Sequence, residues 1–257
     1  MLPVTHTTAP AGGGGSKRHR SGRYSLFVLW VRRLFKPKQM DFQYTLWTML
    51  QLCISPKTAY RHASYHKQTK NHWARDDPAF VVLCAALVAA TATAYCLAFG
   101  NGVGRSMLFI VSAVAVDFLA LGCGIATLGW GLANRALRRK AQHSHAVEQS
   151  VEWMYAFDVH CNAFFPAFLL LAVLQLVLCP VLLTNTFLST VLSAALWALG
   201  LSYYCYLTFL GYSALPFLER TELFLYPIAL VVVAAPLAIL AGINPTKVAL
   251  RFWFDYK

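Results

Sequence analysis

The chain has 257 residues, of which 58% are hydrophobic and only 12% are charged. That charged fraction is about half of the value usual for soluble domains, and residues 159–218 contain no Asp, Glu, Lys or Arg. Because a bilayer span needs roughly 20 apolar residues, these stretches exclude a soluble globular protein. A membrane β-barrel is disfavoured as well, because its strands alternate apolar and polar residues over segments of about 10.

Basic residues are concentrated near the N-terminus. The net charge is +12, and residues 1–78 hold thirteen Lys and Arg against three Asp. The first 23 residues combine four consecutive glycines with a basic cluster at 17–23. Such a stretch buries too little apolar surface to offset the entropy of ordering it. We therefore predict a disordered tail over 1–23.

Residues 24–77 have the pattern of short amphipathic helices. Apolar residues recur at helical spacing from Leu26 to Phe35 and again at Phe42, Leu46, Met49 and Leu50, before Ser55-Pro56 ends the pattern. Neither helix is long enough to span a bilayer. Lys and Arg flank both of them, and each basic group near an anionic membrane surface contributes about 1 kcal/mol. We predict cytosolic interfacial helices that lie on anionic lipid headgroups.

Five apolar segments follow, within a membrane domain that we place at residues 78–245. They cover 79–99, 107–132, 163–184, 187–210 and 223–243. Asp77 and Pro78 suit the N-cap and the first helical position of the first span, and Trp73 is expected at headgroup depth. The predicted fold class is an all-α integral membrane protein, with five transmembrane helices plus cytosolic interfacial amphipathic helices.

The positive-inside rule orients this bundle. The N-terminal region and the loops 133–162 and 211–222 hold eighteen Lys and Arg, whereas the other side holds four. The rule predicts a cytosolic N-terminus and a lumenal tail at 246–257. Within the loop before the third span, apolar residues from Val147 to Phe157 recur at steps of three and four and predict a second interfacial helix.

Asp117 is the acidic residue inside a predicted span. A carboxylate at that depth costs about 3 kcal/mol unless it is paired or protonated. Its candidate partners are the hydroxyls of Ser112, Thr127, Tyr203 and Tyr204. A structural packing contact is one interpretation, and a proton or ligand site is the other.

A polar group of Asp158, His160 and Asn162 precedes the third predicted span. A metal or acid–base site is one interpretation, but Asp-x-His alone supplies too few ligands for a typical zinc site. A polar contact at a helix interface is favoured. Asp117, His160 and Asn162 are our candidates for intramembrane polar contacts, and we predict neither a metal nor a cofactor.

The motifs of intramembrane hydrolases do not fit this sequence. Gly122-Cys123-Gly124 is followed by Ile125 rather than Asp, and the residues around Ser213 do not form a Gly-x-Ser-x-Gly elbow. We therefore predict a protein that is not an enzyme. A small transporter or proton-coupled carrier that uses Asp117 is an alternative, as is RNA binding by the basic N-terminal region.

Several long blocks of the sequence match a known family. They include Arg32-Arg33-Leu34-Phe35, Lys67-Gln68-Thr69-Lys70, Trp73 through Phe80, Tyr155 through His160, and Thr208 through Leu218. Over most of the chain, and in the same order, these blocks resemble the Unc-fifty (uncoordinated-fifty) family of Golgi membrane proteins. Asp117 matches the polar position of that family in the second span.

The resemblance implies a function in vesicle-mediated protein transport at Golgi and endoplasmic reticulum membranes. It implies association with Arf guanine-nucleotide exchange factors and delivery of cargo membrane proteins to the cell surface. Some family members have been placed in the inner nuclear membrane with RNA-binding capacity. The Gly-rich tail, the loop around His143 and the C-terminal tail depart from the family pattern.

We predict that residues 24–77 and the loop 133–162 together form a docking surface for exchange-factor machinery. Charged groups beside two span ends are poorly explained by the bilayer alone. The candidate docking residues are Arg75, Asp76, Asp77, Glu152, Trp153 and Asp158.

Overall fold

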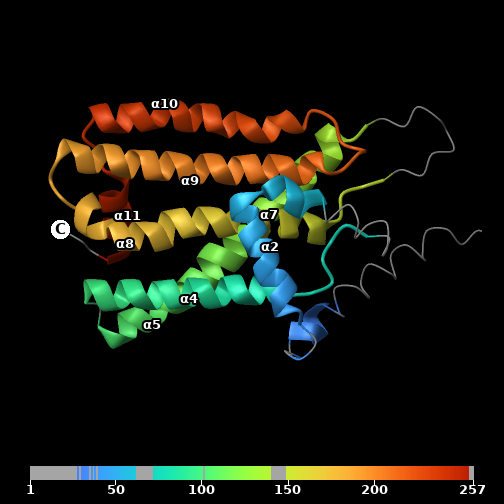
Figure 1. Cartoon of the computed structure of the whole chain (residues 1–257), viewed down its shortest axis with the longest axis horizontal. Coiled ribbons are helices and arrows are strands. Elements are labelled where there is room, and N and C mark those ends of the chain that lie inside the picture. The colour runs from blue at the N-terminus through green and yellow to red at the C-terminus, as the bar shows by residue number, and fades with distance from the viewer. Residues whose placement is uncertain are drawn as a thin grey trace, which may run out of the picture.

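Five helical segments run side by side along the length of the computed structural model (Figure 1). The structure describes residues 28–254 except 29, 35, 37, 39, 62–71, 101 and 140–148. Each of the five segments is long and apolar enough to cross a bilayer. Among the described residues there is no strand, only an isolated bridge between Arg138 and Leu218. The predicted all-α fold with five candidate spans is confirmed.

Two of the spans are single helices, and three are built from consecutive segments. The first is α4 (Ala79–Phe99) and the fourth is α9 (Phe187–Ser213). The second runs through α5 (Val103–Ser112), η2 (Ala113–Ala120), α6 (Leu121–Leu132) and η3 (Ala133–Leu137). The third consists of α7 (Trp153–Phe168), η4 (Leu169–Leu174) and α8 (Gln175–Leu182), and the fifth of η5 (Thr221–Leu225) and α10 (Tyr226–Leu240). Helices α2 (Phe42–Ile54) and α11 (Pro245–Phe254) lie outside the spans.

The third span begins earlier than the sequence indicates. Its first helix starts at Trp153 rather than near residue 163, so Asp158, His160 and Asn162 lie within α7. Of the interfacial helix predicted from Val147 to Phe157, the part from Trp153 onward is the first part of α7, Val151 precedes that helix, and Val147 is outside the described residues. A polar helix start is tolerated here because these three side chains have partners within the bundle.

The centre of the bundle is α7. Thirteen of its 16 residues are buried, and it packs against α2, α4, α6 and α9. Small residues let the helices approach closely, as is usual in membranes. At Gly211 of α9, an added Cβ would lie 2.7 Å from both methyl groups of Val159. By contrast, α10 buries none of its residues and packs on α9 at the edge of the bundle.

The helix α2 lies across one end of the bundle (Figure 1) and contacts α4 and α7. Asp41 caps the N-terminus of α2 by accepting a hydrogen bond from the amide of Tyr44 at 2.9 Å. The helix ends at Ile54 with Ser55 as its C-cap, where the sequence predicts its end. Its buried side chains are Thr45, Thr48, Met49 and Leu52, whereas its exposed apolar side chains are Phe42, Leu46, Trp47, Leu50 and Ile54. Of the predicted apolar face, only Met49 points into the protein.

Trp73, which is expected at headgroup depth, is buried, with its ring centroid 6.0 Å from that of Tyr155 and 6.5 Å from that of Phe217. Its aromatic partners come from α7 and from the segment that follows α9, so the ring contacts protein side chains. Its depth in the membrane stays a prediction.

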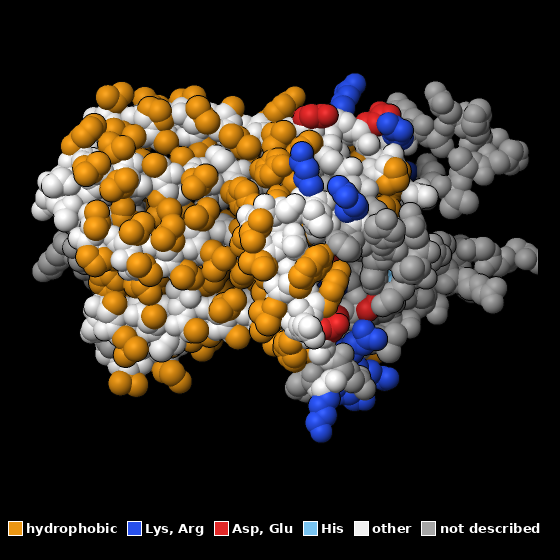
Figure 2. Space-filling view, in the orientation of Figure 1, with side chains coloured by type: hydrophobic (Ala, Val, Ile, Leu, Met, Phe, Trp, Pro, Cys, Tyr) orange, Lys and Arg blue, Asp and Glu red, His pale blue; other side chains and the backbone are white. Residues whose placement is uncertain are grey.

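Charged side chains gather at the end of the molecule that carries α2. On the face shown in Figure 2, Lys, Arg, Asp and Glu lie at that end, and the rest is covered by hydrophobic and uncharged side chains. The C-terminus lies at the opposite end, where the predicted tail contains α11 (Figure 1). The tail predicted over 1–23 lies outside the described residues.

Candidate functional site

At the charged end, the segment that leads into α4 is bonded to the start of α7. The carboxylate of Glu152 accepts hydrogen bonds from the amides of Trp73 and Ala74, both at 3.3 Å. The carboxylate of Asp158 accepts from the amide of Arg75 at 2.7 Å. Two acidic side chains therefore satisfy three consecutive backbone donors that belong to no helix. This arrangement fixes the path of the chain into the first span.

Arg75 continues this contact with its side chain. Its Nη2 donates to Oδ1 of Asn162, and its Cζ lies 4.4 Å from the centroid of the Phe80 ring. Its positive charge attracts the negative charge of the Asp158 carboxylate. The guanidinium contacts the Asn162 amide and the face of the Phe80 ring, whereas its buried Nη1 has no hydrogen-bond partner within the described part of the chain. We call Arg75, Glu152, Asp158 and Asn162 the ionic junction.

Asp76 and Asp77 connect the same segment to more N-terminal residues. The carboxylate of Asp76 binds Nε2 of His72 at 2.5 Å, and its backbone carbonyl accepts from Arg33 at 2.9 Å. The carboxylate of Asp77 accepts from the amides of Ala79 at 3.0 Å and of Asp41 at 2.7 Å. The N-cap of α4 is Pro78, one position after the predicted Asp77. Asp77 bonds the first amide of α4 and also holds the start of α2 against it.

Tyr60 fills the space between the N-terminal region and α9. It is buried, and burial keeps the pKa of its hydroxyl well above the usual value of 10. Its ring lies against Gly211, where an added Cβ would be 3.1 Å from Cε1 of Tyr60. Nearby, the hydroxyl of Tyr203 donates to the carbonyl of Leu52 at 2.9 Å. The N-terminal helical region is therefore docked on the spans at several points.

The loop before α7 is fixed mainly by Asn134 and Trp130, which the sequence pattern did not single out. Asn134 accepts from the amide of Val151 at 2.9 Å and donates to its carbonyl at 3.1 Å, and Trp130 donates to that carbonyl at 2.9 Å. Trp153 donates to Thr127 at 3.0 Å. A polar residue at the end of the second span, Asn134, could have indicated this contact in the sequence. The groups that Asn134 binds are the backbone amide and carbonyl of Val151, and a pattern of side chains does not reveal backbone partners.

Within the bundle, His160 makes the polar contact expected of it. Its Nδ1 lies 2.8 Å from the hydroxyl of Tyr204, and the ring packs against Gly122, where an added Cβ would be 2.6 Å from Nε2. Asn162 contacts Arg75, as described above. Asp117 is different: within the described part of the chain its carboxylate has no hydrogen bond. Its four candidate hydroxyl partners are bonded elsewhere.

These contacts define what the site can do chemically. Among the described residues, no group of three or more His, Cys, Asp and Glu is arranged to hold a metal ion. The hydroxyl of Ser213 bonds Thr221 at 2.9 Å, and His160 bonds Tyr204, so Ser213 and His160 do not form a nucleophile–base pair. The charged end presents instead a fixed platform. Around it lie the exposed apolar side chains of α2 and the exposed charges Arg139, Glu219, Arg220 and Glu222.

The structure therefore brings most of the predicted docking residues into one region. Arg75, Glu152 and Asp158 belong to the ionic junction, Asp76 and Asp77 lie beside it, and Trp153 is bonded to the second span. All six make contacts within the chain. A role in docking stays a prediction, to which we return below.

Comparison with known proteins gives matches over nearly the whole chain. A model described as the UNC-50 family matches residues 30–254. "Protein unc-50 homolog" of Dictyostelium discoideum is 43% identical and covers 100% of both chains. The Bos taurus homolog is 38% identical over 98% of both, and "Protein unc-50" of Caenorhabditis elegans is 40% identical over 91% of this chain and 76% of its own. No solved structure matches.

Proposed function

This chain belongs to the UNC-50 family, and from that membership we propose that it is a non-enzymatic protein of Golgi and endoplasmic reticulum membranes that supports vesicle-mediated protein transport. It docks Arf guanine-nucleotide exchange factor machinery on its cytosolic end and aids the delivery of cargo membrane proteins to the cell surface. The observation that carries this proposal is the ionic junction. Together with the bond from the Asp41 amide to Asp77, it joins the segment 72–77, α2 and the start of α7.

The charge distribution supports the proposed orientation. Lys and Arg side chains are seen at the α2 end in Figure 2. The exposed Lys and Arg in the segments before α4 and between the spans include Arg32, Lys36, Lys57, Arg139 and Arg220. Basic residues favour the cytosolic side, so the N-terminus and this surface face the cytosol. The exposed apolar side chains of α2 then lie near the headgroups of the same leaflet, where an amphipathic helix is stabilised by anionic lipids.

A charge reversal at Asp76 tests the docking surface with the least damage to the fold. Its carboxylate is 20% exposed and pairs with His72, whereas that of Asp77 binds the amides of two helix starts. Asp76→Lys is therefore preferred to reversing both. Glu222→Lys is the matched control, because Glu222 is an exposed acid at the same end but outside the junction.

The measurement is proximity labelling from a tag on the N-terminus, with a glycosylation reporter on the C-terminus. We expect Arf exchange factors among the labelled neighbours, a glycosylated reporter, and loss of exchange-factor labelling in Asp76→Lys but not in Glu222→Lys. All variants are first compared by thermal unfolding. A folded Asp76→Lys protein that keeps both its exchange-factor neighbours and its Golgi location contradicts the docking assignment.

A second candidate function is a proton-coupled carrier, and Asp117 is the observation in its favour. Asp117 lines a cavity of about 220 Å³ together with Phe118, Phe164, Phe168 and other mostly apolar side chains. A carboxylate without a partner inside a span is a functional-site hypothesis by default. Asp117→Asn should abolish proton-coupled uptake into proteoliposomes at normal protein abundance. Reduced abundance with no measurable uptake in the unmodified protein favours a structural role instead.

A further inference from the structure

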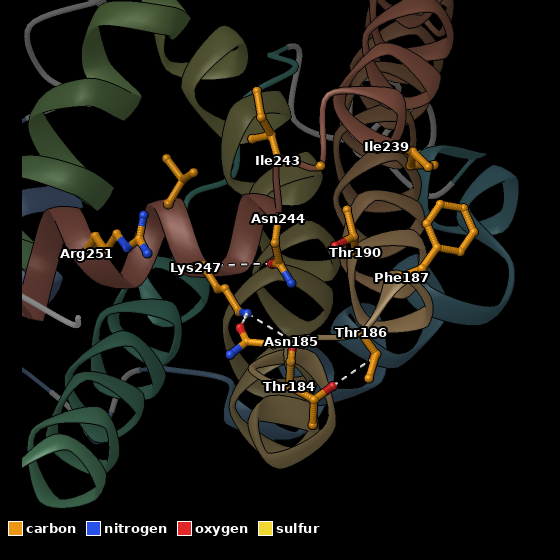
Figure 3. A pocket seen from close by; sticks show the side chains of 12 residues that line it. Thr184, Asn185, Thr186, Phe187, Thr190, Ile239, Ile243, Asn244, Lys247 and Arg251 are labelled. Atoms are coloured by element: carbon orange, nitrogen blue, oxygen red, sulfur yellow. Dashed lines mark hydrogen bonds between the residues drawn. The ribbon is translucent and has the colours of Figure 1, made fainter.

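A second pocket lies at the end opposite to the ionic junction. It is a cavity of about 540 Å³ bounded by the turn 184–186, the start of α9, the end of α10 and α11 (Figure 3). None of the residues that line it is acidic, and two of them, Lys247 and Arg251, are cationic.

Hydrogen bonds hold the α11 wall of the pocket in place. Asn244 donates to the carbonyl of Leu182 at 2.8 Å and accepts from the amide of Lys247 at 3.1 Å. Thr246 is fully buried and is bonded to Ser193 of α9 at 2.8 Å. These bonds fix the backbone of α11, and with it the Cα positions of Lys247 and Arg251, relative to α9.

The two cations are available to a negatively charged ligand. Lys247 and Arg251 are four residues apart, on one side of α11 (Figure 3). The Lys247 ammonium donates to the carbonyl of Thr184 at 2.9 Å and to Oδ1 of Asn185 at 2.6 Å, and a lysine has three such donors. The exposed Arg251 guanidinium has no hydrogen bond or ion pair within the described part of the chain.

The remaining lining residues fit the other parts of an amphiphilic ligand. The Thr190 hydroxyl faces the cavity from the first turn of α9, a 27-residue helix whose N-terminus carries positive partial charge. Phe187, Ile243 and Val248 are exposed by 74%, 49% and 53%, respectively. Polar donors and exposed apolar side chains thus share one rim.

The location of the pocket decides between a soluble ligand and a lipid. It lies where α8 ends at Leu182, α9 begins at Phe187 and α10 ends at Leu240, so it sits at the boundary of the hydrocarbon core. Lipid phosphates lie at this depth. We propose that Lys247 and Arg251 bind the phosphate of an anionic glycerophospholipid, whose acyl chains run along Phe187 and Ile239. This inference does not rest on the proposed role in traffic.

The test uses the full-length protein, purified in a non-ionic detergent, and its thermal unfolding at increasing concentrations of dioleoyl phosphatidic acid. Diacylglycerol with the same chains and inorganic phosphate without chains are the comparison ligands. The variant is Arg251→Gln, because Arg251 is exposed and its loss leaves the core intact. Lys247→Gln is the second variant. Arg105→Gln, which removes a charge near the start of the second span but outside the pocket, is the matched control.

We expect phosphatidic acid to raise the unfolding temperature, and neither comparison ligand to do so. A basic group near a lipid phosphate is worth about fivefold in affinity, so Arg251→Gln should need about five times more lipid for the same shift. Lys247→Gln should act in the same direction, and Arg105→Gln should match the unmodified protein. If all variants respond equally to phosphatidic acid, Lys247 and Arg251 do not form the binding site. If inorganic phosphate raises the unfolding temperature as much as phosphatidic acid does, the ligand is not a lipid. If diacylglycerol does so, the phosphate group is not what the site recognises.

Discussion

The two ends of the bundle are both tied together by hydrogen bonds, but the chemistry differs. At the α2 end, the ionic junction joins the chain before α4 to α7 through Glu152, Asp158 and Arg75. At the other end, neutral groups join α11 to the spans. Gln175 of α8 accepts from Trp197 at 2.8 Å and from Thr246 at 3.1 Å, and donates to Tyr95 at 3.3 Å. We call Tyr95, Gln175, Ser193, Trp197 and Thr246 the neutral latch.

This difference follows from the cost of burying charge. Transferring an ion from water into the protein interior costs several kcal/mol unless well-placed partners compensate its charge. Burying a hydrogen-bonded amide or hydroxyl costs much less. Asp158 and Asn162 of the ionic junction are buried, as are Gln175, Ser193 and Thr246 of the neutral latch. The ionic junction, however, lies at the end of the spans beside exposed charged residues, and its buried carboxylate accepts a backbone hydrogen bond at 2.7 Å. Breaking the ionic junction should therefore lower the free energy of unfolding by more than breaking the neutral latch does.

The largest effect is expected from Arg75→Ala. The substitution leaves Asp158 and Asn162 without the guanidinium, and removing one partner of a buried ionic contact costs about 3–5 kcal/mol. Unfolding of the purified protein in mixed micelles measures this cost. Arg75→Lys, which keeps the charge but not the guanidinium geometry, should retain part of the stability. A loss below about 1 kcal/mol would mean that the junction does not hold the fold together.

A helix contact beside the junction gives the next largest effect. In Gly122→Ala the new methyl group would lie 2.6 Å from Nε2 of His160, which is held by Tyr204. Such overpacking costs about 1–3 kcal/mol. Gly124 is two residues away in α6 and has nothing within 4 Å of an added Cβ, so Gly124→Ala should be neutral or slightly stabilising. Equal stabilities of the two variants would contradict this close approach.

Thr246→Val tests the neutral latch at a smaller cost. It removes the hydroxyl bonds to Ser193 and Gln175 while keeping the side-chain shape. Neutral hydrogen bonds contribute about 1 kcal/mol each, so the loss should be about 1–2 kcal/mol. Hydrogen exchange should increase in α11 and stay unchanged in α7. Thr93→Val is the control, because the exposed Thr93 hydroxyl bonds only the Ala89 carbonyl of its own helix.

The smallest effect is expected for the surface ion pair Arg139–Glu219. Its atoms are 2.8 Å apart, but the two side chains are 62% and 54% exposed. Exposed pairs contribute about 0–1 kcal/mol and are screened by salt. Arg139→Ala should therefore leave the unfolding transition nearly unchanged at physiological ionic strength. A loss as large as that of Arg75→Ala would remove the distinction between buried and exposed ionic contacts.

Parts of the α2 end could be predicted from the sequence. The Asp77 bond at the start of α4 and the end of α2 before Ser55 depend on neighbouring residues, so local patterns were enough. The start of the third span could not be predicted, because Asp158 and His160 look like headgroup residues until Arg75 and Tyr204 are placed beside them. Of the apolar residues predicted on one face of α2, Phe42, Leu46 and Leu50 are exposed and Met49 is buried. Thr45 and Thr48 bond the backbone of their own helix and can therefore be buried.

The sequence by itself determined the fold class and the number of spans, because transfer of apolar side chains into a bilayer is a nearly additive property of each segment. It also predicted the acceptor side chain of Asp77 at the start of the first span and placed the cations at one end. The tertiary structure alone decided which polar groups meet. The ionic junction joins residues 83 and 87 positions apart, and the neutral latch joins Gln175 to Thr246, 71 positions apart. Such pairings depend on how the helices pack, and no local pattern records that.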